Sequence, residues 1–449
     1  MGSNEGTDPH SSEEEEPLVV SVDGAPSSSV VRTPPRKHTR DLHILSFAFL
    51  FVFSAYGAAQ NLESTVNNEG NIGTISLAIL YLSFTLFSII ASPVVRVLGS
   101  KRALVLGTSG YLLFIAANLS PSWYTMVPAS VYLGFTASII WVGEGTYLTT
   151  AALCHAEDNN LHEGTVIGAF NGEFWSMFAS HQVIGNLLSL ALLRNGEGDD
   201  VTGKNLLFTV FLVCMIIGIV MMCFLSKRDE KKHDKPTCTS LGSLLKSSFA
   251  PLLDKRMLLV IPLIAYSGLQ QAFVWAEYTE KIVTPALGIS GVGGSMAVYG
   301  AADAICSLVA GRLTSGLHSI TWIVSIGAFL QAFVLLWLLF GYRLTSGLMG
   351  MVNPLLMGAI WGVGDGVFNT QLSALLGLLF KDNKEAAFAQ LKVWQCAAIA
   401  VIFFIYPYIS LNFMLVLMLV ELIISISSFL LLTLVLVRPT SAGILNPSS

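Results

Sequence analysis

The sequence predicts an all-α membrane protein, with twelve transmembrane helices arranged as two pseudo-symmetric six-helix bundles. The first observation is composition, because 53% of the 449 residues are hydrophobic and only 12% are charged. Soluble domains carry about 25% charged residues, so this excess of apolar residues needs lipid. The second observation is run length, because twelve apolar runs reach the roughly 20 residues that cross a bilayer as a helix. The third is an internal repeat.

The repeat joins the two halves of the chain. VGEGTY at Val142–Tyr147 returns about 220 residues later as VGDGVF at Val363–Phe368, and each copy holds a carboxylate between two glycines. AYGAAQN at Ala55–Asn61 returns in the same way as AYSGLQQ at Ala265–Gln271. Two six-span halves that are parallel repeats, joined by a linker, are typical of the major facilitator fold.

The apolar runs define the elements in order along the chain. We place the spans near residues 42–62, 73–95, 103–120, 124–150, 165–193, 205–226, 257–279, 292–316, 319–340, 347–379, 386–410 and 412–437. The predicted domains are a disordered acidic cytoplasmic tail over 1–41, an amino-terminal six-helix bundle over 42–226, a cytoplasmic linker over 227–256, a carboxyl-terminal six-helix bundle over 257–437 and a cytoplasmic tail over 438–449. The first tail is rich in Ser, Pro and Glu, a composition that favours disorder.

The distribution of Lys and Arg predicts the orientation. Nineteen of the 24 basic residues fall on the side that holds both termini and the linker, four fall on the other side, and Lys392 is intramembrane. The positive-inside rule then places both termini in the cytoplasm. The sequence leaves open whether the membrane is the plasma membrane or an endomembrane such as that of the vacuole or endosome. It offers no basic surface for nucleic acid.

Charged side chains inside the predicted spans are costly in lipid and are functional candidates. The candidates for a cavity or coupling role are Glu144, Asp365, Glu173, Lys392 and Asp303. The first and fourth spans of each half line the central cavity in this fold, so Glu144 and Asp365 are expected to face each other across it. Such a pair either binds or senses a cation by protonation, or it forms a structural clamp between helices or with Lys392.

Lys392 and Glu173 occupy equivalent places in the two halves. One hypothesis is a gating ion pair between them. The alternative is that each pairs locally, or that the long Lys392 side chain reaches the nearby membrane interface.

Two further sets of residues are candidates for packing or binding. The amides of Gln60, Asn61, Gln270 and Gln271 give the first span of each half a matching pair, which either coordinates a ligand or hydrogen-bonds across the halves. Gly164, Gly168 and Gly172 lie on one face of the fifth span. They allow backbone-to-backbone packing within the chain or docking of a partner's helix.

The sequence contains no phosphate-binding loop, dinucleotide motif, nucleophile elbow or metal-ligand spacing. We therefore expect no enzyme activity, no catalytic residue, no cofactor and no metal site. The expected partners are the lipid bilayer, together with a channel or other membrane protein, or a small solute or cation.

The loop between the second and third spans departs from the usual facilitator pattern, G-x-x-x-D-[RK]-x-G-[RK]-[RK]. The segment SPVVRVLGSKR at Ser92–Arg102 keeps Gly99, Lys101 and Arg102, but Ser92 replaces the first glycine and Arg96 replaces the acid. In facilitators that acid helps to lock the closed cytoplasmic face. Its loss argues against ordinary alternating access.

Other segments resemble one branch of the superfamily, the uncoordinated-93-like family. The strongest is GTVIGAFNGEFWSMFASHQVIGN at Gly164–Asn186, which is similar to the family pattern F-N-G-x-F-[WF] followed by a serine and a closing G-N. The resemblance covers about residues 42–437, and Glu173 stands where it implies an apolar residue. Studied members are not simple carriers: one is similar to a regulatory subunit of two-pore potassium channels, another escorts Toll-like receptors, and plant relatives are linked to potassium homeostasis.

The resemblance implies a regulatory or accessory subunit that influences potassium transport. Two alternatives stay open. One is a proton-coupled secondary transporter of a small solute or cation that uses Glu144 and Asp365. The other is a membrane trafficking chaperone that binds the helices of client proteins.

Overall fold

The structure is a computed structural model that describes residues 35–66, 72–193, 201–228, 249–342, 347–405 and 408–436. Every regular element in these ranges is helical. Ten of the described helices are long and apolar enough, by length and composition, to cross a membrane. Two further long helices, α3 and α5, complete the predicted set of twelve, which confirms the all-α membrane fold class.

The elements follow the predicted spans closely. The first half consists of α1 (Pro35–Val66), α2 (Ile72–Leu98), α3 (Ser100–Ala117), α4 (Trp123–Asn159), α5 (Glu163–Leu193) and α6 (Val201–Cys223). The second half consists of η2 (Ala250–Leu253), α8 (Lys255–Phe273), the π-helix η3 (Val274–Val283), α9 (Thr284–Leu287), α10 (Ile289–Leu313), α11 (Leu317–Leu336), η4 (Trp337–Gly341), α12 (Leu348–Leu379), α13 (Lys384–Ile405), α14 (Leu411–Leu430) and η6 (Leu431–Leu436).

One predicted boundary differs. The helix α1 begins at Pro35, so residues 35–41, which we expected in the disordered tail, are helical. Proline suits the first turn of a helix because its fixed φ is already helical and its missing N–H would be unbonded there. The buried side chains of His38 and Asp41 then anchor this turn. The rest of the amino-terminal tail, the carboxyl-terminal tail and most of the linker lie outside the described residues, so the predicted domain limits stay a prediction.

Helix starts are fixed by local caps. The Ser122 hydroxyl accepts from the backbone N–H of Thr125 at the start of α4, and the Asp254 carboxylate accepts from that of Arg256 at the start of α8. Each cap satisfies a backbone donor that the helix itself leaves unbonded. Gly99 joins α2 to α3 with φ at 78°, a conformation that favours glycine.

The packing of the helices repeats between the halves. In the first half α1 packs on α5 and α6, while α4 packs on α2 and α3. In the second half the equivalent α8 packs on α13 and α14, while α12 packs on α10 and α11. This shared pattern of neighbours defines the two pseudo-symmetric six-helix bundles.

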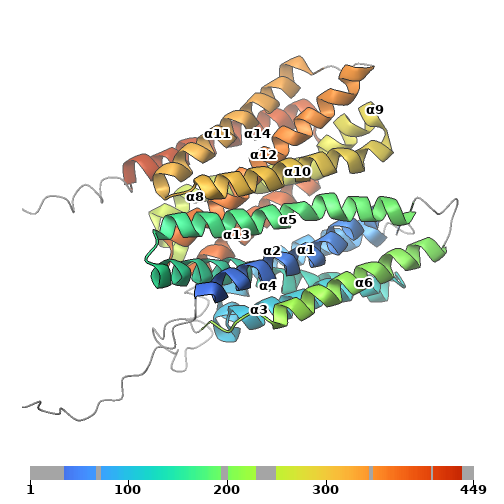
Figure 1. The fold of residues 1–449 in the computed structure, drawn as a ribbon. Helices are drawn as coiled ribbons and strands as arrows, with labels where there is room; N and C mark the ends of the chain where they lie inside the picture. Colours follow the sequence, from blue (N-terminus) through green and yellow to red (C-terminus); the bar gives the residue numbers. More distant parts are fainter. Residues whose placement is uncertain are drawn as a thin grey trace, which may run out of the picture. The chain divides into compact units, whose positions relative to one another are not determined.

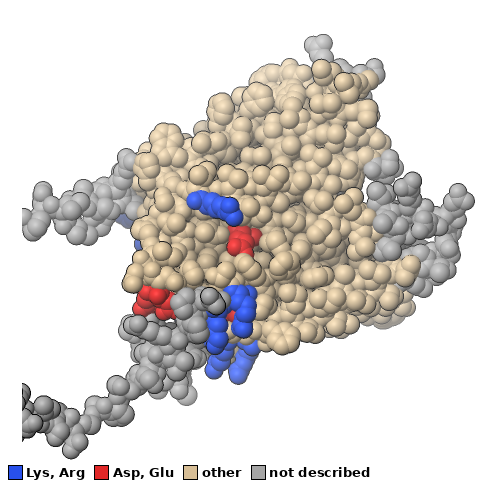
Figure 2. All heavy atoms as spheres, in the orientation of Figure 1, with Lys and Arg blue, Asp and Glu red and all other residues tan. Residues whose placement is uncertain are grey.

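The bundles meet along two equivalent seams. Helix α5 runs beside α10, and α2 runs beside α13 (Figure 1). Helix α4 also contacts α12 and α13, and α5 also contacts α12. We use the term linker end for the end of the helices at which α1 begins and α6 finishes. On the face drawn in Figure 2, the charged side chains of the described residues gather toward this end, and the other described residues on this face are uncharged.

Candidate functional site

The two matched acids lie on equivalent helices, Glu144 on α4 and Asp365 on α12. Both are buried, with 3% and 6% of their surface exposed. Neither side chain therefore projects into the surrounding hydrocarbon. Their hydrogen-bond environments differ, however, and the difference defines the site.

Asp365 is held entirely by residues of its own bundle. Its carboxylate accepts from Tyr299 Oη at 2.6 Å, from Gln271 Nε2 at 3.0 Å and from Asn369 Nδ2 at 2.8 Å. Three donors from α8, α10 and α12 therefore converge on one carboxylate. Such an arrangement positions the acid and ties three helices together.

Glu144 lacks the equivalent donors. In the first bundle, Gln60 Nε2 donates instead to the Tyr81 hydroxyl at 2.6 Å, although Tyr81 is the repeat counterpart of Tyr299. Oε1 of Glu144 is buried and accepts no hydrogen bond from the described residues. Because an unpaired buried polar atom is costly, Glu144 has unused bonding capacity that Asp365 lacks.

Lys392 supplies the positive charge between the bundles. Its side chain on α13 is only 7% exposed, and Nζ donates to Gln395 Oε1 at 2.9 Å. Nζ also lies 4.3 Å from the ring centroid of Trp141 on α4. The charge of Lys392 attracts both Glu144 and Asp365. The ammonium of one bundle thus rests on an aromatic ring of the other.

The other two charged candidates differ in their placement. Asp303 lies close to Asp365, since a Cβ on the adjacent Gly366 would be 2.9 Å from Asp303 Oδ1, whereas Glu173 pairs elsewhere. Asp303 on α10 is 7% exposed and accepts from the Ser307 hydroxyl at 3.0 Å. Glu173 on α5 pairs with Nδ1 of His43 on α1 at 2.6 Å, not with Lys392. The Glu173 pair is therefore local, and the buried Lys392 does not extend to the membrane interface.

The amide pairs hydrogen-bond within their own bundles. Gln60 binds Tyr81, Gln271 binds Asp365, and Gln270 Nε2 donates to the backbone carbonyl of Trp361 at 3.3 Å. The Asn61 side chain lies outside the described residues. The amides therefore support the helix packing around the acids.

The three glycines of α5 face the end of α10 and the residues just after it, rather than the lipid. A Cβ on Gly172 would lie 2.6 Å from Cα of Gly311, and a Cβ on Gly168 would lie 2.3 Å from Cβ of Thr314. A Cβ on Gly164 would meet the carbonyl of Ser315 at 2.9 Å. The close backbone approach along the α5–α10 seam requires residues without side chains.

A polar contact also joins the bundles at the linker end. Arg96, the residue that replaces the usual acid, donates to Asn383 Oδ1 at 2.8 Å and lies 3.6 Å from the Glu385 carboxylate. Lys381 pairs with Glu163 nearby. Here the base, Arg96, is on α2 and the acid, Glu385, is on α13. Charges of opposite sign therefore lie close together across the two bundles.

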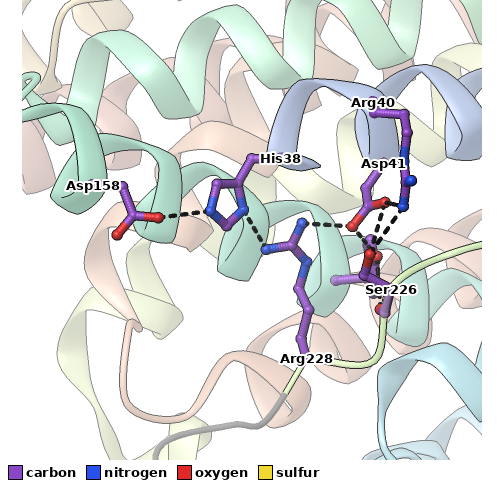
Figure 3. A network of polar contacts seen from close by, with 7 residues as sticks. His38, Arg40, Asp41, Asp158, Ser226 and Arg228 are labelled. Atoms are coloured by element: carbon purple, nitrogen blue, oxygen red, sulfur yellow. Dashed lines mark hydrogen bonds and ion pairs between the residues drawn. The ribbon is translucent and has the colours of Figure 1, made fainter. Parts of the chain in front are cut away.

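A second polar network fixes the start of α1 to the start of the linker (Figure 3). The His38 ring lies between Asp158 Oδ2, at 2.9 Å, and Arg228 Nη1, at 2.7 Å. Four donors converge on the buried carboxylate of Asp41, and they come from Arg40, Tyr147, Ser226 and Arg228. This network ties the end of α4 and the first linker residues to α1.

Sequence reasoning missed several of these residues. Trp141 read as an ordinary apolar residue, and Trp175 read only as part of the family pattern. His38, Asp41 and Arg228 read as parts of a tail and a linker. The repeated Tyr81 and Tyr299 were a usable signal, since a tyrosine that recurs in a span has a hydroxyl that needs a partner.

Comparison with known proteins decides the family. The model of the family described as "Ion channel regulatory protein UNC-93" matches residues 65–430. The chain belongs to the UNC-93 family. The Arabidopsis thaliana "UNC93-like protein 3" is 64% identical over 389 residues, which cover 85% of this chain and 83% of that protein. The Danio rerio "Protein unc-93 homolog A" is 32% identical over 84% of this chain and 87% of its own length.

A nematode relative and two solved structures complete the comparison. The Caenorhabditis elegans "Putative potassium channel regulatory protein unc-93" is 30% identical over 88% of this chain and 61% of its own length. The Escherichia coli fucose:proton symporter FucP has a TM-score of 0.67 at 10% identity, over 88% of this chain and 99% of its own. The human organic anion transporter MFSD10 also has a TM-score of 0.67, at 12% identity over 89% and 100%. These likenesses confirm the major facilitator fold for this UNC-93 family member.

Proposed function

We propose that this protein is a regulatory or accessory subunit that influences potassium transport through a membrane-protein partner. The observation that carries the proposal is the position of Lys392, an ammonium from one bundle that rests on Trp141 of the other. A cation-coupled carrier needs a buried acid whose charge the transported ion compensates. Here the chain's own ammonium attracts both matched acids, and three donors already bind Asp365.

Family membership supports the same function. The family model carries the description of an ion channel regulator, and the nematode relative's name specifies a potassium channel. The reversed charges of Arg96 and Glu385 also separate this chain from facilitators that use the usual acid in that loop.

The test compares the protein alone with the protein beside a channel. In proteoliposomes with a potassium gradient, the purified protein is expected to give no rubidium flux above empty vesicles. When the protein is coexpressed with potassium channels of its own organism, channel current is expected to change, and the two proteins are expected to copurify in mild detergent. Rubidium flux by the purified protein alone would contradict the proposal.

A proton-coupled carrier is the second candidate, and the unbonded Oε1 of Glu144 is the observation that favours it. A buried carboxyl oxygen without a partner is a ready proton or cation acceptor. Under this candidate, an imposed pH gradient drives solute uptake into proteoliposomes, and Glu144→Gln abolishes the uptake while the protein remains folded.

We also infer that the linker end faces the cytoplasm. Nineteen of the 24 basic residues in the sequence fall on that side, and the charged side chains in Figure 2 gather there. Cys223, the last residue of α6, is exposed at this end and gives a direct test. A membrane-impermeant maleimide is expected to label Cys223 in cells only after permeabilisation. Labelling in intact cells would show that the linker end faces the outside instead.

A further inference from the structure

We propose that Lys392 is the built-in occupant of an aromatic cation site, and that a small alkylammonium ion binds there when the lysine side chain is removed. The walls come from the amino-terminal bundle. The indoles of Trp141 and Trp175 stack with centroids 5.9 Å apart and an interplanar angle of 13°. Lys392 Nζ lies 4.3 Å from the first centroid and 6.0 Å from the second. Trp175 is itself held by a hydrogen bond to Ser373 of α12.

The polar side of the site offers acceptors rather than donors. Gln395 Oε1 accepts from Lys392 Nζ at 2.9 Å. Glu144 is 97% buried and attracts the ammonium, yet its Oε1 has no hydrogen-bond partner among the described residues. The charge of Asp365 also attracts Lys392. The side chains around Nζ therefore hold more acceptor capacity than Lys392 uses.

The chemistry of the walls selects the class of ligand. Aromatic faces bind organic ammonium groups well once water is excluded. A metal cation such as Ca²⁺ or Mg²⁺ needs six or more oxygen ligands, which two indoles do not supply. Replacement of Lys392 by alanine would remove three carbons and the ammonium nitrogen, and propylammonium has the same heavy atoms. The site therefore fits a compact, singly charged alkylammonium.

This inference does not depend on a channel partner, so it can fail while the proposed function holds. It assigns the central position, where a carrier of this fold would hold its solute, to a residue of the chain itself. The native protein is then closed to free cations at this position, and a single substitution opens it.

The experiment measures the thermal stability of purified protein in detergent against propylammonium concentration. For Lys392→Ala we expect a melting temperature that rises with propylammonium and saturates, whereas the wild type shows no such rise because its own ammonium fills the site. Neutral 1-propanol is expected to have no comparable effect on the variant. In Lys392→Ala with Trp141→Leu, the propylammonium concentration for half-saturation is expected to increase about tenfold or more.

Two arrangements keep the test decisive if Lys392→Ala folds poorly. The variant is also purified in propylammonium, and a larger monodisperse fraction than in sodium counts as binding. Lys392→Met keeps a stem of the same length and vacates only the ammonium position, so it is tested with the ammonium ion. The proposal is overturned if neither variant responds, if the wild type responds equally, or if 1-propanol replaces propylammonium.

Discussion

Arg228 donates from Nη1 to Nδ1 of His38 over 2.7 Å. Arginine has only donors, so Nδ1 must carry the lone pair and the ring proton must sit on Nε2. That proton is then donated to Asp158 at 2.9 Å. One neutral imidazole thus uses both nitrogens to hold the start of the linker and the end of α4 against α1.

The His38 bond predicts a stability loss. Substitution His38→Ala leaves Arg228 and Asp158 without their shared partner, and we expect a loss of about 2–4 kcal/mol. Thermal unfolding in detergent, followed by intrinsic fluorescence, measures it. His43→Ala is the control on the same helix, because the His43 side chain is 51% exposed and its pair with Glu173 lies nearer the surface. Equal losses in the two variants would show that the network does not anchor α1.

The α5–α10 seam predicts intolerance of a single methyl group. In Gly172→Ala the new Cβ would lie 2.6 Å from Cα of Gly311, so the helices must separate. We expect a loss of about 1–3 kcal/mol in unfolding free energy. Gly293→Ala on α10 is the matched control, since nothing lies within 4 Å of its new Cβ. That control is expected to be neutral or to gain about 0.5–1 kcal/mol.

The unequal environments of the two acids predict unequal costs of neutralisation. In Asp365→Asn an NH2 group replaces one carboxylate oxygen. That oxygen accepts from Tyr299, Gln271 or Asn369, so the new N–H donor would point at an existing donor and one hydrogen bond would be lost. We expect a loss of about 2–4 kcal/mol in Asp365→Asn and a smaller loss in Glu144→Gln. The measurement is the melting temperature of each purified variant. The opposite order would mean that Glu144, not Asp365, is the structural acid.

The contact at Arg96 predicts a rescue by charge exchange. Arg96→Glu brings two acids together at Glu385, which weakens the junction of α2 with α13. Hydrogen–deuterium exchange of the α12–α13 connection is expected to speed up in the single variant. Exchange is expected to return toward the wild-type rate when Glu385→Arg is added. Failure of the double variant to slow exchange would remove this pair from the inter-bundle contact.

The cap of α8 predicts a pH dependence. Hydrogen bonds from Arg256 lower the pKa of Asp254, which lies just outside the membrane-spanning segment. A depressed folded-state pKa adds stability that is present above the ordinary pKa of aspartate and is lost as pH falls through the folded value. The melting temperatures of the wild type and Asp254→Asn should therefore differ at about pH 7 and converge toward about pH 3. A constant difference would assign the effect to the cap alone.

The fold could be predicted from the sequence because run length and repetition are properties of the chain. Apolar runs gave the twelve helices, and the VGEGTY and VGDGVF echo placed Glu144 and Asp365 on equivalent helices. The start of α1 was missed because the buried contacts of His38 and Asp41 involve residues over a hundred positions away. No local composition reports such contacts.

The partners of each acid could not be predicted. Repetition implies equal surroundings, yet Tyr299 bonds an acid while its counterpart Tyr81 bonds an amide. The two halves have the same helix arrangement, so the difference lies in the direction that each side chain takes. A single sequence does not reveal that direction. The contact of Lys392 with Trp141 is of the same kind, since it joins residues far apart in the chain.

The placement of Lys392 makes the surroundings of its charge depend on how the two halves sit against each other. Its ammonium belongs to the carboxyl-terminal half, and the indole beneath it belongs to the amino-terminal half. Any rocking of one half against the other must lift that cation from its ring and expose it to a different dielectric. A movement of one half against the other would therefore change the electrostatic environment of this buried charge.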